Sequence, residues 1–126
     1  MGYKALKVGV LSTARVNELL GTELEDAELW VSKAAHRHIA LDHPDDYKIV
    51  LPRLAYVISD PSYVGQKPGN PDNFYLVRKF GGVEGAVLVA VGVERNKFGT
   101  YNVRSSYLIS EADVQRYKEA GHLWIV

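Results

Sequence analysis

The most chemically dense part of the chain is HRHIALDHPDD, residues 36–46, which contains three of the four histidines. An imidazole side chain titrates near neutral pH, so a histidine can take up and return a proton during acid–base catalysis, and it is also a common metal ligand. The stretch therefore indicates a proton-transfer site, a metal site or a polar helix end.

Helical spacing argues against the metal site. On a helix His36 and His38 lie about 200° apart around the axis, so they cannot bind one ion from the same face. His38 and His43 are five positions apart across an expected helix end, and the chain has no cysteine for a thiolate zinc site. We therefore expect no metal and no other cofactor. Structural roles stay open for both residues: His38 bonded to the backbone, and His43 as a turn residue.

Two strands and several helices are expected to position these histidines. Ser32 can accept a hydrogen bond as the N-cap of the helix that carries them, and this helix must end near His43 because Pro44 disfavours helical geometry before it. Pro44 can begin a second helix, and Pro52 either kinks it or begins a third. The expected elements of this half are strands over 5–12 and 27–32 and helices within 12–21, 33–42 and 44–58.

The second half of the chain changes to a strand pattern. Three β-rich runs, 73–80, 85–94 and 100–109, are separated by short connections that contain glycine, which predicts an antiparallel meander. Ser110 can then cap a closing helix over 110–121. A loop of functional length, rich in proline and glycine, is expected over 59–73.

Polar side chains on the outer β-rich runs could grip a phosphate. Arg78 and Lys79 lie on one run, and Arg104 lies on another next to two serines and a tyrosine. Strand alternation predicts that Arg104 and Ser106 share one face and that Ser105 and Tyr107 share the other. For each basic residue, a solvated strand edge is an equally good interpretation.

Composition limits the possible partners. The 126 residues include 15 Lys+Arg and 15 Asp+Glu, so the formal charge is zero and there is no bulk attraction to nucleic acid or to an anionic membrane. The chain fits one domain, residues 1–126. It has no apolar run of about 18 residues and no signal peptide, so we expect a cytoplasmic protein without a membrane partner.

The order of these motifs resembles the phage-associated nucleases of the barnase, EndoU, colicin and RelE superfamily, known as the BECR fold. The resemblance is strongest over residues 27–126. Its sharpest part is HIALDHP followed by ISDPSYV, and VAVGV and VRSSYLIS match more loosely. It implies an α+β fold with N-terminal helices packed on a four-stranded antiparallel sheet.

The resemblance also implies a function. Such domains are metal-independent endoribonucleases of phages or polymorphic toxins, which cleave RNA, tRNA included, by attack of a ribose 2′-hydroxyl. An immunity or antitoxin protein would be a partner, and the domain would act in a cytoplasm, its own or one into which a larger protein delivers it.

The resemblance assigns roles to individual residues. His38 matches the family's acid–base histidine, with His43, Tyr107 or His122 as a second proton-transfer group. Either Ser105 or Ser106 matches the family's serine or threonine. The implied catalytic residues are His38, Lys79, Ser106 and Tyr107, and the implied substrate-binding residues are His43, Arg78, Arg104 and Ser105.

Two other functions compete with the ribonuclease. Many nucleases of this kind are basic, whereas this chain is neutral, which favours an inactive nucleic-acid-binding or virion-associated module of the same fold. A strand carrying Arg104, Ser105 and Ser106, with Glu111 after it, also prompts an ADP-ribosyltransferase, although the Glu-x-Glu spacing often used by such enzymes is missing.

Overall fold

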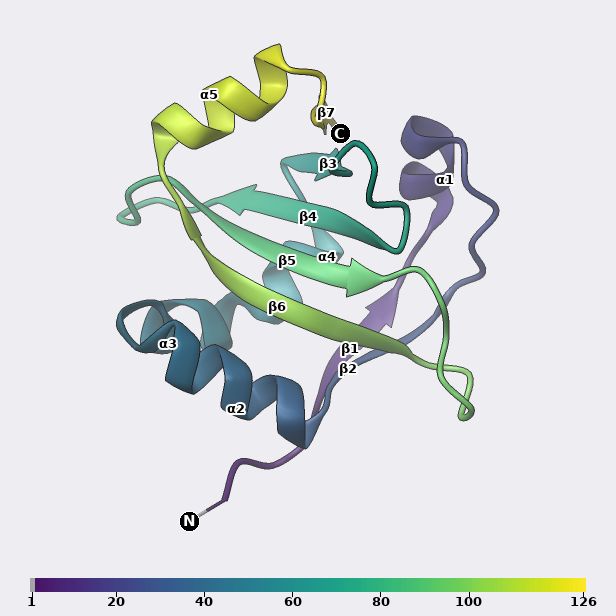
Figure 1. Ribbon diagram of the computed structural model, residues 1–126, viewed down its shortest axis with the longest axis vertical. Coiled ribbons are helices and arrows are strands. Elements are labelled where there is room, and N and C mark those ends of the chain that lie inside the picture. The colour runs from purple at the N-terminus through teal and green to yellow at the C-terminus, as the bar shows by residue number, and fades with distance from the viewer. Residues whose placement is uncertain (1) are drawn as a thin grey trace.

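The computed structural model describes residues 2–126 as an α+β protein built on one mixed sheet (Figure 1). The sheet is flanked by short helices, and one 3₁₀ turn, η1, links two of them. In chain order the elements are β1 Leu6–Leu11, α1 Ala14–Leu20, β2 Ala27–Val31, α2 Lys33–Asp42, α3 Pro44–Val50, η1 Leu51–Arg53, α4 Leu54–Ser59, β3 Tyr63–Gly65, β4 Asn73–Lys79, β5 Ala86–Gly92, β6 Tyr101–Ile109, α5 Glu111–Glu119 and β7 Leu123–Ile125.

The four-stranded antiparallel sheet implied by the resemblance is wrong. Within residues 2–126 the sheet has seven strands in the order β1-β2-β6-β5-β4-β3-β7, and β2 and β6 run parallel while the other neighbours are antiparallel. The first two strands join one side of the meander through β2, and β3 and β7 extend the other side. β3 and β7 have three residues each, too few for a strand pattern to be recognised in the sequence.

The antiparallel meander is confirmed, and it forms the centre of the sheet. Strands β4, β5 and β6 occupy the three predicted runs. Every residue of β5 is buried, as expected for a central strand that is apolar on both faces. Gly85 turns the chain into β5 at a φ of +77°, and a Cβ there would collide with the carbonyl oxygen of Ile109, so this turn requires glycine.

The predicted helix boundaries in the first half are also confirmed. The Ser32 hydroxyl accepts a hydrogen bond from the Ala35 amide at 3.1 Å, and α2 ends at the residue before His43. Pro44 begins α3, and Pro52 lies in η1, where the change of helical geometry separates α3 from α4. None of the helices described in residues 2–126 is long and apolar enough to cross a membrane.

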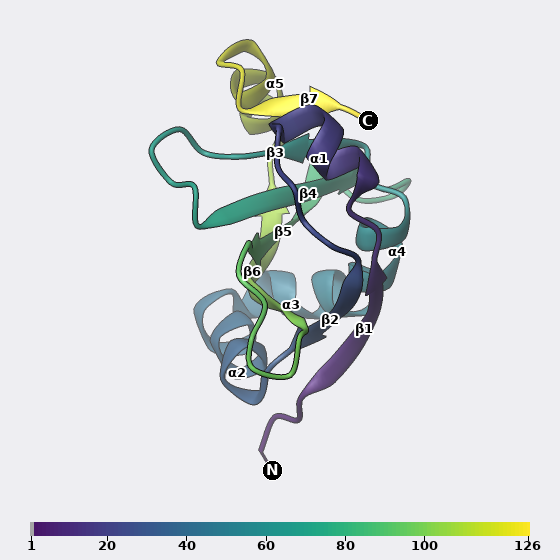
Figure 2. The same cartoon turned by 90° about the vertical axis from the view of Figure 1, so that its right-hand side faces the viewer.

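The two faces of the sheet are covered differently. Leu54, Val57 and Ile58 of α4 pack with the odd-numbered valines of β5 on one face. On the other face, α5 packs through Val114 over one end of the meander. Helices α2 and α3 lie along the edge of β6, and no helix of residues 2–126 crosses the strip of sheet between them and α5 (Figures 1 and 2). We call this part of the surface, formed by side chains of the strands themselves, the open strip.

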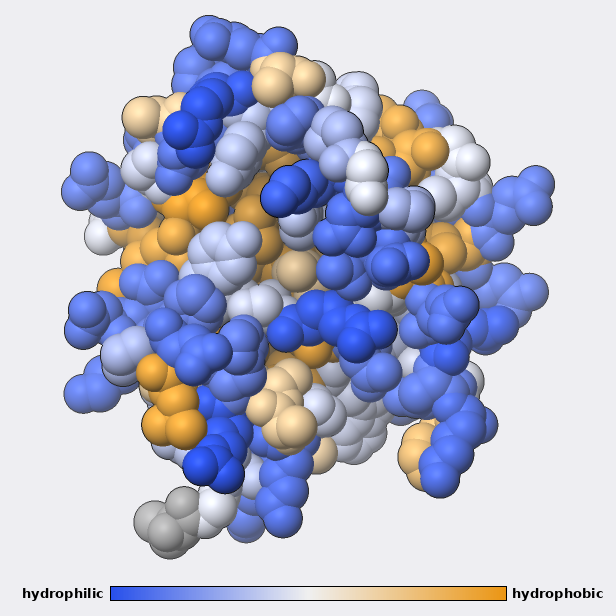
Figure 3. Space-filling model, viewed as in Figure 1, coloured by the Kyte–Doolittle hydropathy of each residue, from blue (hydrophilic) through white to orange (hydrophobic). Residues whose placement is uncertain are grey.

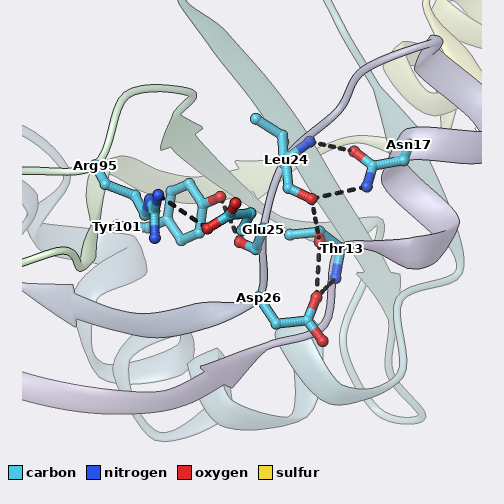
Figure 4. Close-up of polar contacts among 7 residues, drawn as sticks. All are labelled: Thr13, Asn17, Leu24, Glu25, Asp26, Arg95 and Tyr101. Atoms are coloured by element: carbon cyan, nitrogen blue, oxygen red, sulfur yellow. Dashed lines mark hydrogen bonds and ion pairs between the residues drawn. The ribbon is translucent and has the colours of Figure 1, made fainter.

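A polar network fixes the segment that leads from α1 into β2 (Figure 4). The buried Thr13 donates its backbone N–H and its hydroxyl to Asp26 Oδ1, each at 2.7 Å. Asn17 bonds both the N–H and the carbonyl oxygen of Leu24. These bonds satisfy backbone groups that would otherwise have no partner in a segment without regular structure.

The same segment is also tied to β6. The Tyr101 hydroxyl donates to the Glu25 carbonyl oxygen at 2.6 Å, and Arg95 forms an exposed ion pair with the Glu25 carboxylate (Figure 4). The start of β2 is therefore held against the start of β6, where the two strands run parallel.

We predict that Asp26→Asn lowers the free energy of unfolding at neutral pH. The two hydrogen bonds from Thr13 favour the carboxylate and hold the Asp26 pKa below its usual value. Its stabilising effect is complete above the ordinary aspartate pKa and is lost as the pH falls through the depressed one. The difference between wild type and variant should therefore shrink below about pH 4. Urea unfolding across this pH range measures it.

The control for this prediction is Glu25→Gln, which removes an exposed ion pair and should change stability little. A loss of stability in Asp26→Asn that stays constant down to about pH 2 would contradict the ionisation argument.

Candidate active site

The site begins at an edge of β6 that β2 leaves unpaired. Only Leu29 and Trp30 of β2 pair with β6, and beyond that point the same edge is covered by α2 and α3. Asp46, in the first turn of α3, accepts a hydrogen bond at 3.0 Å from the backbone N–H of Leu108. A side chain thus takes the place of the missing strand and fixes α3 on the sheet.

A bulge in β6 changes which side chains face the open strip. Ala90 pairs with Ser105 while Val91 pairs with Val103, so Arg104 is an extra residue in β6. A bulge turns one additional side chain toward the same face of the sheet as its neighbour.

The Arg104 side chain lies over Gly92, because a Cβ on that glycine would be 2.8 Å from Arg104 Nε. Gly92 faces the same side as Leu88. Arg104 therefore lies on the face of Ser105, and the prediction that strict alternation would put it with Ser106 is wrong.

His38 is at the centre of the cluster. Its Nδ1 lies 2.6 Å from Oδ2 of Asp42, one helical turn further along α2, and its Nε2 lies 3.4 Å from the Ser105 hydroxyl. The carboxylate orients the ring and fixes the proton on Nδ1, which leaves Nε2 able to accept a proton. The His38 side chain is 42% exposed, so it lies at the surface of the protein.

His43 and Tyr107 extend the cluster along β6. Their rings stack with centroids 5.0 Å apart, and the His43 ring is 5.8 Å from that of His38, nearly perpendicular to it. Burial raises the pKa of Tyr107, and the neighbouring Tyr75 and Tyr117 raise it further. The phenol therefore remains a hydrogen-bond donor well above neutral pH.

Of the eight site residues implied by the resemblance, the structure brings four into one cluster, places Arg104 beside Ser105 on the same face and leaves three apart. Ser106 is fully buried and donates its hydroxyl to the Leu88 carbonyl oxygen at 2.7 Å, so Ser105 takes its place at the open strip. Arg78 lies on the α4 side of the sheet, beside Asp60 and over the Phe80 ring.

Lys79 lies at the far end of β4 and is bound to a carboxylate. It pairs with Glu111 at 3.2 Å, and this hydrogen bond is the main reason why its pKa is raised. Lys79 thus meets α5 and does not join His38. His36 is also outside the cluster, because its ring nitrogens bond the Lys4 carbonyl oxygen and the Tyr47 hydroxyl in a buried setting.

Two residues of the site were missed in the sequence. Asp42 follows His38 at the i,i+4 spacing that makes side chains neighbours on a helix, so this signal was available. Asp46 had no such signal, because its partner is a backbone amide 62 positions away. Within residues 2–126, no three His, Asp or Glu side chains converge in a way that could hold a metal ion.

Figure 3 shows the open strip in the view of Figure 1. Apolar surface is exposed between α5 and α2, and hydrophilic side chains surround it. A shallow surface of this kind, with an oriented imidazole, a hydroxyl and a guanidinium at one side, suits hydrolysis or transfer at a phosphodiester.

The class of the protein follows from a comparison with family models. A family model described as phage-Barnase-EndoU-ColicinE5/D-RelE like nuclease3 matches residues 6–116. The match covers most of the chain, so the protein belongs to this nuclease family, and the resemblance noted in the sequence is confirmed. Searches among curated proteins and among solved structures found no match.

We predict that Asp46→Ala destabilises the protein by about 1–2 kcal/mol, because it leaves the Leu108 N–H without an acceptor at a covered edge. Asp45→Ala is the matched control, since both residues lie in the first turn of α3 and both lose the same interaction with the helix dipole. Urea unfolding measures the difference, and equal losses in the two variants would contradict the docking role of Asp46.

Proposed function

We propose that the protein is a metal-independent endoribonuclease in which His38 transfers the proton of a ribose 2′-hydroxyl. The observation that carries this proposal is the line from Asp42 through His38 to Ser105, which leaves one imidazole nitrogen directed at the open strip. The family supplies the nuclease activity, and a nitrogen placed in this way supports the choice of RNA, whose 2′-hydroxyl is an internal nucleophile.

In the proposed reaction Nε2 of His38 removes the 2′-hydroxyl proton, and the oxygen attacks the adjacent phosphorus. Arg104 stabilises the negative charge that develops on the non-bridging oxygens, and Tyr107 donates a hydrogen bond to them. His43 donates a proton to the departing 5′-oxygen, so that the P–O5′ bond breaks. The products are a 2′,3′-cyclic phosphate and a 5′-hydroxyl.

Ser105 has a role in the protein without substrate. Its hydroxyl lies 3.4 Å from His38 Nε2, which is long for a hydrogen bond between these groups. A ribose hydroxyl that enters the strip can replace this weak contact with a shorter one, and Ser105 then remains to bind the ribose.

Charge favours a second candidate, an RNA-binding module without catalysis. The chain is neutral overall, and both Lys79 and Arg78 are paired with carboxylates, Glu111 and Asp60 respectively. Such a module would bind RNA with a salt-dependent affinity and leave it intact.

We predict that His38→Ala lowers the rate of RNA cleavage about 10²- to 10⁴-fold, the usual contribution of a general acid–base group. The measurement is cleavage of tRNA and of a structured RNA in the presence of a chelator, with the termini identified by mass. Arg37→Ala is the matched control, because it removes an exposed residue of the same helix. The same sequence as DNA should stay intact.

Intact RNA with a folded wild-type protein, together with binding that weakens in salt, would replace the ribonuclease by the binding module. Equal cleavage by wild type and His38→Ala would remove His38 from the mechanism.

We predict that Asp42→Ala lowers kcat about 10- to 100-fold with little change in KM, by analogy with carboxylates that orient metal-bound imidazoles. The fold should tolerate this change, because a carboxylate at the C-terminal end of α2 is unfavourable for the helix dipole. Steady-state kinetics measures kcat and KM, and thermal unfolding measures the stability of the variant. A variant that unfolds more readily while keeping its kcat would show a purely structural role for Asp42.

A further inference from the structure

Beside the histidine cluster, the open strip contains a cleft of about 400 Å³ under α5. It is lined by tyrosines from three elements, Tyr75 of β4, Tyr107 of β6 and Tyr117 of α5, and Leu88 and Leu123 contribute apolar surface. Its volume falls in the range of about 300–1,000 Å³ that is common for small-molecule sites. Tyr107 also stacks on His43, so the cleft adjoins the proposed catalytic cluster.

The three tyrosines are not simply core residues. Each is only half-buried, and among the hydrogen bonds within residues 2–126 none involves the hydroxyl of Tyr75, Tyr107 or Tyr117. The raised pKa values of Tyr75 and Tyr107 have partial burial as their main cause, and Tyr117 contributes to both. The cleft thus offers aromatic rings and three phenol hydroxyls without a protein partner.

Two cations lie at the border of this cleft. Lys67, in the loop between β3 and β4, is exposed and forms no ion pair within the described part of the chain. Arg116 stacks over Tyr117 with 5.4 Å from its guanidinium carbon to the ring centroid, and also pairs with Asp113. Aromatic surface bordered by cations is the combination that binds single-stranded nucleic acid, by stacking the base and neutralising a phosphate.

We propose that this cleft is a base-binding subsite that holds one unpaired nucleotide next to the scissile phosphate. The inference rests on the proposed ribonuclease function and adds to it the recognition of a base by aromatic contact with Tyr75 and Tyr117. The Tyr117 ring also stacks on His122, with 6.1 Å between the ring centroids, so a base that enters the cleft extends an existing stack. A base stacked in the cleft must be unpaired, so the substrate is RNA with a single-stranded or looped segment at the cleavage point. The free hydroxyls of the tyrosines then face the polar edge of the base, where purines and pyrimidines differ.

The test is the binding of mononucleotides, followed by NMR chemical shifts. Uridine 3′-phosphate and adenosine 3′-phosphate are titrated into wild type, Tyr117→Leu and Tyr56→Leu, with ribose 5-phosphate as the probe that lacks a base. Tyr56 is the matched control because it is an exposed tyrosine of α4, outside the cleft. We expect about ten-fold weaker nucleotide binding in Tyr117→Leu, no change in Tyr56→Leu and shifts centred on residues of the cleft.

Tyr117→Phe is a second control, because it keeps the aromatic ring and should keep most of the nucleotide affinity. It separates loss of the ring from a folding defect in Tyr117→Leu. Ribose 5-phosphate that binds as well as the nucleotides, or nucleotide binding unaffected by Tyr117→Leu, would overturn the base subsite. So would nucleotides that shift only residues outside the cleft.

The two proposals fail in different ways. The catalytic proposal is judged by the rate of RNA cleavage in His38→Ala, and the subsite by the nucleotide affinity of Tyr117→Leu. If no RNA is cut but Tyr117→Leu still weakens nucleotide binding, the catalytic proposal fails and the subsite stands. If RNA is cut with His38 required and Tyr117→Leu has the nucleotide affinity and KM of wild type, the subsite alone fails.

Discussion

The structure depends on the unpaired edge in the middle of its sheet. β2 leaves β6 after two paired residues, and the exposed backbone beyond them must be covered and given partners. Helices α2 and α3 provide the cover, and Asp46 provides an acceptor for the Leu108 N–H. Because the helix that carries His38 precedes α3 with a single residue between them, docking of α3 also sets the position of the imidazole. One backbone requirement thereby brings a helix and a strand distant in sequence to the same place.

The bulge at Arg104 determines which side chains of β6 lie next to His38. Without it, alternation would direct a guanidinium and the Ser105 hydroxyl to opposite faces. With it, both lie on the open face, and the room for the Arg104 side chain comes from the missing side chain of Gly92. β6 thus combines parallel pairing with β2 at its start, the bulge, and an antiparallel register with β5 up to Ile109, and this combination positions the functional groups.

The helix ends and the central strand of this fold could be predicted because they depend on residues close together in the sequence. The N-caps Ser32 and Ser110, the break before Pro44 and the apolar central strand could all be recognised in the sequence. The bulge could not, since it depends on how β5 pairs with β6, and neither could Asp46, whose partner is far along the chain. Asp42 could have been found, because its i,i+4 spacing to His38 makes the two side chains neighbours on a helix.

The neutral charge of the chain constrains how it could hold a polyanion. The number of phosphates neutralised sets the salt dependence of RNA binding, and several basic residues of this protein are already paired with carboxylates. On the open face Arg104 and Lys67 form no ion pair within residues 2–126, so the proposed substrate would be held by few phosphate contacts. Base stacking adds affinity that does not depend on net charge. The two proposals together are therefore compatible with a neutral nuclease, because the tyrosine cleft would recognise the base while Arg104 would bind the reacting phosphate.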